Sequence, residues 1–149
     1  MTPTEPRPTL VTAAFWLLVV GAVLLLAGGL LSVTINFDTL RHAAAPSVSD
    51  QAIRDFIRLH RAAGVACAMA AVGLSALVVR TRAGDPRFRR ATIALGLVTI
   101  VLVALIAVFV GTHILALLSL LPIIAGTLLL TRPPVVEWFN ADDQAGPDA

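Results

Sequence analysis

The sequence has no lysine, no tyrosine and a single cysteine among its 149 residues. One cysteine, Cys67, excludes an intramolecular disulfide bond and a Cys-x-x-Cys redox pair. Charge is scarce as well: charged residues make up 13% of the chain, whereas soluble domains average about 25%. Because so few charges cannot cover the surface of a water-soluble globule, the composition excludes a soluble enzyme, a disordered tail and a nucleic-acid-binding module.

Apolar residues take the place of the missing charges. They make up 58% of the chain, the mean hydropathy is +0.90, and runs without a charged residue cover 11–35, 62–79 and 91–131. A helix needs about 20 residues to cross roughly 30 Å of hydrocarbon, so each of the first two runs supplies one span. The third run is too long for one span and must fold back. The sequence therefore predicts an integral membrane protein.

The turn within the third run is expected at Gly111-Thr112-His113, the only turn-like cluster near its middle. A turn at Pro122 would leave too few residues for a final span, so this proline is interpreted as a kink within the last helix. A cleaved signal peptide is the alternative for the first run. That run, however, far exceeds the usual apolar stretch of about 7–15 residues, and it is interpreted as a retained anchor.

These runs predict an all-α fold, an antiparallel four-helix transmembrane bundle with a short amphipathic outer segment. The membrane domain is expected over 13–131, with spans at about 13–35, 62–79, 91–110 and 114–131, the outer segment at 36–61 and the inner loop at 80–90. Residues 1–12 are expected to form an N-terminal tail. Residues 132–149 are expected to form an acidic and disordered tail.

The inner loop is dense in positive charge, with Arg80, Arg82, Arg87, Arg89 and Arg90. Short loops rich in arginine stay in the cytoplasm. An even number of spans then places both termini in the cytoplasm. The same arginines are expected to contact anionic lipid headgroups or a partner.

The outer segment holds a second set of arginines, on the side where the topology rule does not need them. Arg54, Arg58 and Arg61 follow the i, i+4, i+7 spacing of one helix face. An apolar arc lies about 120° away on the same helical wheel, and it consists of Ile53, Phe56, Ile57 and His60. The arginines are candidates for contact with a lipid phosphate, a cell-envelope glycan or a partner subunit, and a solvated face is the alternative.

Two placements of this amphipathic helix remain open at the level of sequence. The helix either lies on the outer leaflet or extends the second span above the membrane. Ser47 or Ser49 is expected to cap its N-terminus. Asp50 is expected to form an ion pair with Arg54, because the two residues are four apart.

The second span is rich in small residues at helical spacing, namely Gly64, Ala66, Cys67, Ala70 and Gly73. Small residues let the backbones of two membrane helices approach closely. We expect these residues to pack within the bundle, with a second protein or a second copy of the chain as the alternative neighbour.

The spans contain no carboxylate, lysine or arginine that could form a proton relay or an ion pathway. Their hydroxyls are expected to bond to a backbone carbonyl one turn back. His60 and His113 lie at the outer ends of helices and could hold a haem or a metal ion as a pair. Contact with headgroups and water is the favoured interpretation, so no catalytic residue, metal site or cofactor is predicted.

The layout from Ala14-Phe15-Trp16 through the stretch 82–90 resembles the small four-span membrane proteins common in actinobacteria. Those proteins share an aromatic start to the first helix, a variable outer segment and an Arg/Gly inner loop. The resemblance implies a plasma-membrane location and carries no activity. We expect a non-enzymatic accessory or scaffolding protein that acts through helix packing and contacts with lipids or a partner. The alternative is a subunit of an oligomeric small transporter or channel.

Overall fold

The computed structural model describes residues 8–83 and 85–144, and for 141–144 the backbone alone. Within these ranges the chain forms α-helices and no β-strand. The helices are α1 (Thr9–Val33), α2 (Phe37–Ala43), α3 (Asp50–Thr81), α4 (Pro86–Phe109), α5 (Ile114–Leu130) and α6 (Pro133–Gln144).

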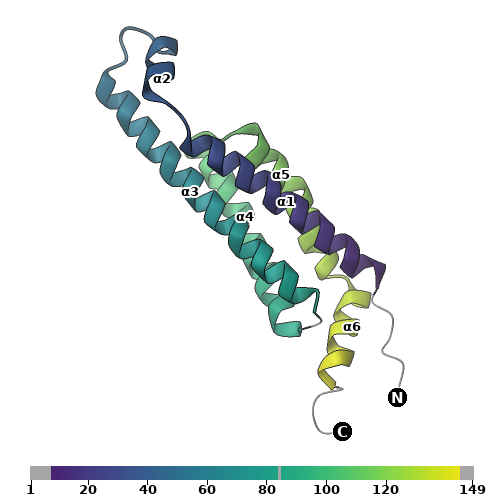
Figure 1. The fold of residues 1–149 in the computed structure, drawn as a ribbon. Helices are drawn as coiled ribbons and strands as arrows, with labels where there is room; N and C mark the ends of the chain where they lie inside the picture. Colours follow the sequence, from purple (N-terminus) through teal and green to yellow (C-terminus); the bar gives the residue numbers. More distant parts are fainter. Residues whose placement is uncertain (1–7, 84, 145–149) are drawn as a thin grey trace.

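Four of these helices form an antiparallel bundle (Figure 1). The closest packing is between α1 and α5 and between α1 and α3, and α4 completes the ring by contacts with α3 and α5. Each helix therefore runs against its neighbours in the opposite direction. This arrangement confirms the predicted all-α, antiparallel four-helix bundle.

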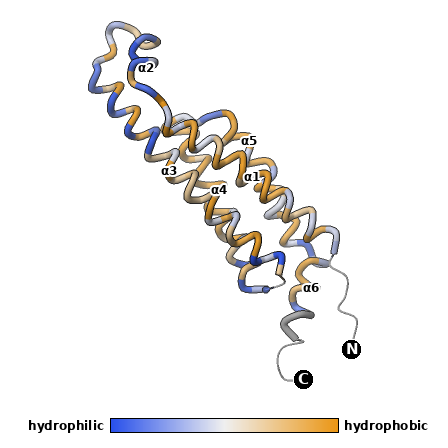
Figure 2. The backbone as a smooth tube through the Cα atoms, in the orientation of Figure 1, coloured by the Kyte–Doolittle hydropathy of each residue, from blue (hydrophilic) through white to orange (hydrophobic). Residues whose placement is uncertain are grey.

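The helices have the length and composition of membrane spans. Three of them, α1, α3 and α4, are long and apolar enough to cross a bilayer, and α5 and α6 together form a fourth candidate that bends by 57° between the two helices. Hydrophobic residues cover the middle of the bundle, and hydrophilic residues gather toward its two ends (Figure 2). The described residues therefore have the character of a membrane protein with three candidate spans, or four if the bent pair counts as one.

The buried residues of each long helix recur at alternating steps of three and four. In α1 they are Val11, Ala14, Leu18, Gly21, Leu25, Gly28 and Ser32. In α3, α4 and α5 the same steps connect Gly64, Cys67, Ala71, Leu74 and Val78; Arg89, Thr92, Gly96, Thr99, Val103 and Ile106; and Ala116, Ser119, Ile123, Gly126 and Leu130. This repeat is typical of bundles in which helices cross at a small angle with a left-handed twist.

The caps and the turn follow from local sequence. Ser49 caps α3 by accepting a hydrogen bond from the backbone N–H of Ala52 at 3.2 Å. The α4–α5 turn contains Gly111 with a φ of 78°, a conformation that favours glycine. Pro122 lies inside α5, which continues through it. The structure therefore confirms the turn at 111–113, the serine cap and the placement of Pro122 within the last long helix.

The structure decides one placement that the sequence left open, and it moves predicted boundaries at both ends of the chain. Helix α3 is continuous from Asp50 to Thr81, about 48 Å long at 1.5 Å per residue, so the amphipathic stretch extends the second span. Disorder from residue 132 onward is wrong for 133–144, because Val135 and Phe139 of α6 are fully buried at the end of the bundle. Residues 145–149 of that tail lie outside the described ranges. At the other end, α1 begins at Thr9, so the last part of the expected tail 1–12 is helical.

Candidate functional site

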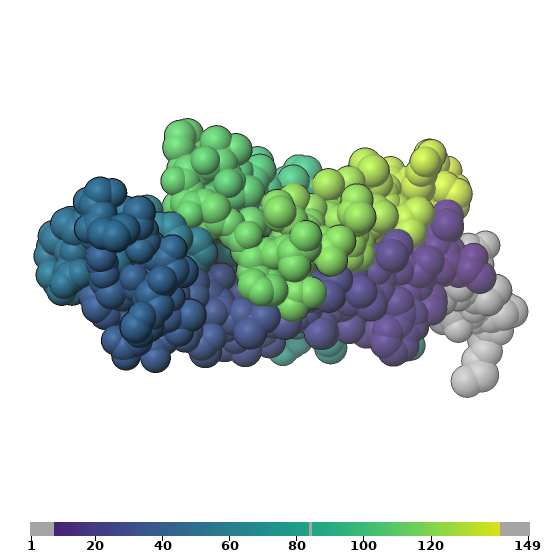
Figure 3. Space-filling view, turned by 90° about the horizontal axis from the view of Figure 1, so that it is seen from above, coloured from purple at the N-terminus to yellow at the C-terminus, as the bar shows by residue number. Residues whose placement is uncertain are grey.

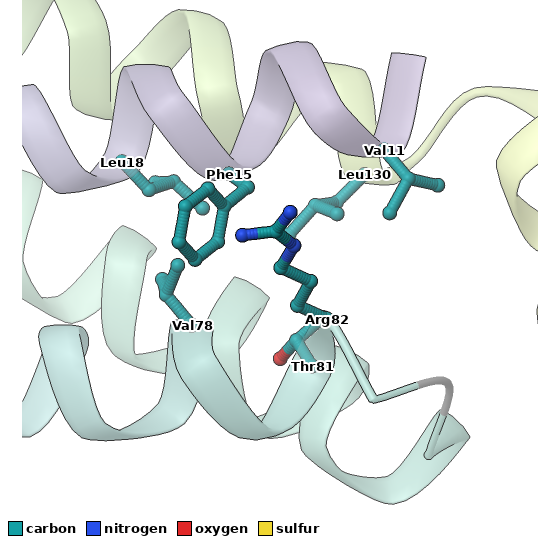
Figure 4. A pocket seen from close by; sticks show the side chains of 7 residues that line it. All are labelled: Val11, Phe15, Leu18, Val78, Thr81, Arg82 and Leu130. Atoms are coloured by element: carbon teal, nitrogen blue, oxygen red, sulfur yellow. The ribbon is translucent and has the colours of Figure 1, made fainter. Parts of the chain in front are cut away.

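The interior of the bundle is filled by its own side chains. A crevice at the end shared by the start of α1 and α6 has a volume of about 10 Å³ and is lined by Val11, Phe15, Leu18, Val78, Thr81, Arg82 and Leu130 (Figure 4). A cavity of this volume has room for a single water molecule. This crevice therefore has no room for a ligand larger than water.

The buried hydroxyls are satisfied within the protein in most cases. Ser32 donates to the carbonyl of Gly28 at 2.9 Å, and Thr99 donates to the carbonyl of Leu95 at 2.7 Å. Ser119 likewise donates to the carbonyl of residue 116, whereas Thr81 and Thr92 bond to each other at 2.7 Å. The predicted bond to a carbonyl one turn back is therefore confirmed for Ser32, Thr99 and Ser119 but not for Thr92. Among the residues with described side chains, the buried hydroxyl of Thr127 alone lacks a partner.

The predicted small residues of α3 occupy two different environments. Gly64 is buried against α1, where an added Cβ would lie 2.6 Å from the carbonyl oxygen of Gly29. Cys67 is buried on the same side of the helix. The other three residues, Ala66, Ala70 and Gly73, are half-buried. A Cβ added at Gly73 would lie 3.3 Å from the end of the Leu95 side chain of α4.

Sequence reasoning missed the glycines that join α1 to α5. An added Cβ at Gly21 would lie 2.5 Å from the Ile123 side chain, and one at Gly28 would lie 2.7 Å from the Ala116 nitrogen. A Cβ added at Gly126 of α5 would lie 2.7 Å from the side chain of Leu18 in α1. The signal was present in the sequence, since Gly21 and Gly28 are seven residues apart and share one face of α1.

The inner-loop arginines contact aromatic rings of the protein itself. Figure 4 shows the Arg82 guanidinium beside the Phe15 ring, 4.6 Å from its centroid. Arg80 lies 5.7 Å from the ring of Phe88. Such cation–π contacts hold each guanidinium near the end of the bundle. Arg87 and Arg90 are exposed.

Arg89 differs from the other four arginines of the inner loop. It is buried, donates to the carbonyl of Leu130 at 3.1 Å, and lies 5.7 Å from the Phe139 ring of α6. The predicted lipid or partner contact is therefore wrong for this residue. The cause is the fold, because the last carbonyls of a helix such as α5 lack partners within the helix, and the guanidinium of Arg89 supplies one.

The opposite end of the bundle carries an outer extension, which we define as α2, the loop after it and α3 up to Arg61. Figure 3 shows this extension, in blue, projecting past the turn between α4 and α5. The extension contacts the bundle through Arg61, which donates to the carbonyl of Ile35 at 3.1 Å. Its loop is closed by Arg41, which donates to the carbonyl of Val48 at 2.6 Å.

Two ion pairs stabilise the outer extension, and neither is the predicted one. Asp50 pairs with Arg41 at 3.4 Å, so the expected pair with Arg54 is wrong. Helix α2 brings Arg41 to the start of α3, which the spacing within α3 could not reveal. Asp55 pairs instead with Arg58 at 3.5 Å. The Asp55–Arg58 pair is exposed and the Asp50–Arg41 pair is partly exposed, so each contributes at most about 1 kcal/mol.

The two faces of the amphipathic helix are separated as predicted. Ile53 and Ile57 are buried, Phe56 is partly exposed and stacks on His60 at 4.8 Å, and the three arginines are exposed. The Arg54 guanidinium lies 6.0 Å from the ring centroid of Phe37 in α2. An open groove of about 290 Å³ separates the two helices there and is lined by Phe37, Arg54, Ile57, Arg58 and Arg61. The fold therefore brings the predicted arginine stripe to the wall of one groove.

The two histidines predicted at the outer ends of helices differ: His60 stacks on Phe56 and its buried Nδ1 has no hydrogen-bond partner within the described part of the chain, whereas His113 serves local structure. His113 accepts a hydrogen bond from the backbone N–H of Leu115 at 3.3 Å and so caps α5. Among the described residues, no group of three or more His, Cys, Asp or Glu side chains lies close enough to hold a metal ion.

Comparisons of the chain with protein-family models, with curated proteins and with solved structures find no match.

Proposed function

We propose that this chain is a non-enzymatic accessory or scaffolding subunit of the bacterial plasma membrane, with both termini in the cytoplasm. In this proposal the bundle is the anchor and the outer extension is the working surface, in contact with lipids and with a partner membrane protein or a second copy of the chain. The observation that carries the proposal is the outer extension itself, outside a filled bundle: it holds the arginine-lined groove, and the exposed ring of Phe56 lines a second, apolar groove of about 290 Å³ between α2 and α3.

The orientation in this proposal rests on the distribution of arginine. Arg80, Arg82, Arg87 and Arg90 are exposed at the end where α1 begins and α6 lies. Positive charge in short loops favours the cytoplasmic side. The outer extension then faces the outside of the cell, where its arginines can meet outer-leaflet phosphates or a partner's acidic groups.

Site-specific crosslinking tests the proposed working surface in native membranes. A photoreactive side chain at Phe56, which is 42% exposed on the outer extension, is expected to give one discrete protein adduct. The matched control is Val101, which is 58% exposed in the middle of α4 and is expected to give lipid adducts alone. The absence of a protein adduct at Phe56 would contradict the scaffolding proposal.

Flux measurements separate this function from the alternative, a subunit of an oligomeric small transporter or channel. Purified chain in phosphatidylcholine vesicles is expected to release trapped ions at the rate of protein-free vesicles, since the apolar runs 11–35, 62–79 and 91–131 hold no charged residue to line a path. A saturable flux that depends on the amount of protein would contradict the accessory role and support the transporter alternative.

A further inference from the structure

One face of α3 changes character along its length. Residues 54, 58, 61, 65, 68 and 72 follow one another at steps of four and three, so they form a single stripe. The first three are arginines, and the last three are Val65, Ala68 and Val72. Figure 2 shows the same change along α3, from hydrophilic at the outer extension to hydrophobic within the bundle.

A groove runs beside each half of this stripe. The upper groove, of about 290 Å³, lies between the arginines and Phe37 of α2. The lower groove, of about 600 Å³, lies between α3 and the end of α1 and is lined by Leu30, Val33, Val65, Ala68, Met69, Val72 and Gly73. Both grooves therefore follow the crevice between α3 and the chain segment that runs from α1 into α2.

Arg61 marks the junction of the two grooves. Its guanidinium donates to the carbonyl of Ile35, where the chain leaves α1 and turns toward α2. Val65, one turn further along α3, already lines the lower groove. The junction therefore places cationic groups directly above an apolar channel, and that channel opens on the lipid-facing side of the bundle, where Met69 and Val72 are 70% and 60% exposed.

We propose that this crevice is a binding site for one anionic phospholipid of the outer leaflet. Arg54, Arg58 and Arg61 hold the phosphate, and one acyl chain lies in the lower groove against Val65 and Val72. The proposal deepens the function above and rests on its placement of the outer extension outside the cell. Anionic lipid is favoured because, among the described residues, only Arg58 of these three arginines forms an ion pair, with Asp55, and because guanidinium groups bind phosphate through paired hydrogen bonds.

The apolar half of the crevice distinguishes a phospholipid from a soluble phosphate. A free phosphate or a phosphorylated sugar would use the upper groove and leave the lower one to bulk lipid. The half-buried small residues Ala68 and Gly73 line the lower groove, and helix propensity does not explain Gly73, since a glycine within a helix lowers its stability. Small side chains at these two positions keep the lower groove deep enough for an acyl chain.

Lipid retention by the full chain tests the site. The chain is reconstituted in vesicles of phosphatidylcholine and phosphatidylglycerol in equal amounts and extracted with mild detergent. A wash at high salt then removes lipids held by screened surface charge alone. We expect wild-type protein to retain phosphatidylglycerol severalfold above its share in the vesicles. Each arginine near a membrane surface is worth roughly a fivefold preference.

Two variants address the two halves of the crevice. R54Q/R58Q/R61Q is expected to bring the ratio of the two lipids back to that of the vesicles. Val72→Trp, which fills the lower groove, is expected to release the bound lipid without changing any charge. Its matched control is Val101→Trp on α4, at almost the same exposure, 58% against 60%, and it is expected to retain the lipid.

Several outcomes would overturn the site while leaving the scaffolding function standing. One is equal retention of phosphatidylglycerol by wild type, R54Q/R58Q/R61Q and Val72→Trp, each with an unchanged circular dichroism spectrum. Another is displacement of the lipid by soluble glycerol phosphate at constant ionic strength, since this probe lacks the acyl chains. A second copy of the chain in the crevice would appear as a dimer that Val72→Trp dissociates. The Phe56 crosslink reports the scaffolding function independently of all three results.

Discussion

At Gly29 and Gly64 two helix backbones meet with no side chain between them. A Cβ added at Gly29 would lie 2.7 Å from the carbonyl oxygen of Gly64, and one added at Gly64 would lie 2.6 Å from that of Gly29. Real Cβ atoms do not approach backbone atoms so closely, so α1 and α3 would have to separate. In a membrane, where no hydrophobic drive joins helices, such close packing supplies much of the association energy.

A pair of alanine substitutions tests this contact at the residue scale. Gly64→Ala is expected to destabilise the bundle by roughly 1–3 kcal/mol, because overpacking displaces a backbone. Gly73→Ala is the control: its added Cβ would meet only the flexible end of Leu95 at 3.3 Å, and alanine favours a helix by roughly 0.5–1 kcal/mol. The stability of both variants is measured by unfolding with SDS in mixed micelles, monitored by circular dichroism. Equal stability of the two variants would contradict the glycine contact.

The formation of helix α6 and its packing against the bundle were not predicted from the sequence. This helix turns by 57° from α5 and buries Val135 and Phe139 completely, while Arg89 of α4 lies against the Phe139 ring. The same Arg89 donates to the last carbonyl of α5. The end of the bundle therefore couples α4, α5 and α6 through one arginine and one phenylalanine.

This coupling predicts the effect of removing the ring. Phe139→Ala is expected to release α6 from the bundle, since truncation of a fully buried phenylalanine costs roughly 3–5 kcal/mol, more than so short a helix gains from its other contacts. Amide hydrogen exchange should then rise over 133–144 and stay unchanged over α1 to α5. Asn140→Ala, at an exposed neighbouring position, is the control and should leave the exchange of α6 as in wild type. Unchanged protection in Phe139→Ala would show that the ring does not hold α6.

The whole molecule is polarised along the axis of the bundle. One end holds exposed arginines 80, 82, 87 and 90 and helix α6, and the other end holds the outer extension with its arginine-lined groove. Between them lies a filled core surrounded by exposed aliphatic side chains. Such a molecule can anchor and present a surface without enclosing a path of its own.

Reporter fusions test the orientation of this axis. A reporter active only in the cytoplasm is expected to work when fused after Ala149 or inserted within 82–87, because arginine-rich short loops are retained there. The same reporter near Ala44, in the outer extension, is expected to be inactive. Activity at Ala44 would reverse the orientation and place the arginine-lined groove on the cytoplasmic side.

The four long helices of the bundle followed from the sequence alone, for a physical reason, whereas α2 and α6 did not. A bilayer requires long uncharged segments with satisfied backbones, so hydropathy, Gly111 and the Ser49 cap fixed the helices and their turns. The amphipathic stripe of Arg54, Arg58 and Arg61 was equally visible, because it depends on spacing within one helix. These features depend on residues that lie close together in the sequence, so they can be predicted without knowledge of the fold.

Tertiary structure decided the features that depend on which helix stands beside which. The meeting of Gly29 with Gly64, the burial of Arg89 against Phe139, and the pairing of Asp50 with Arg41 all join residues from different elements. Spacing within one helix cannot reveal such partners, because it does not determine which other helix packs against a given face. The same holds for the crevice beside α3: the sequence supplied its arginines, and the packing of α1 and α2 against α3 gave them a groove.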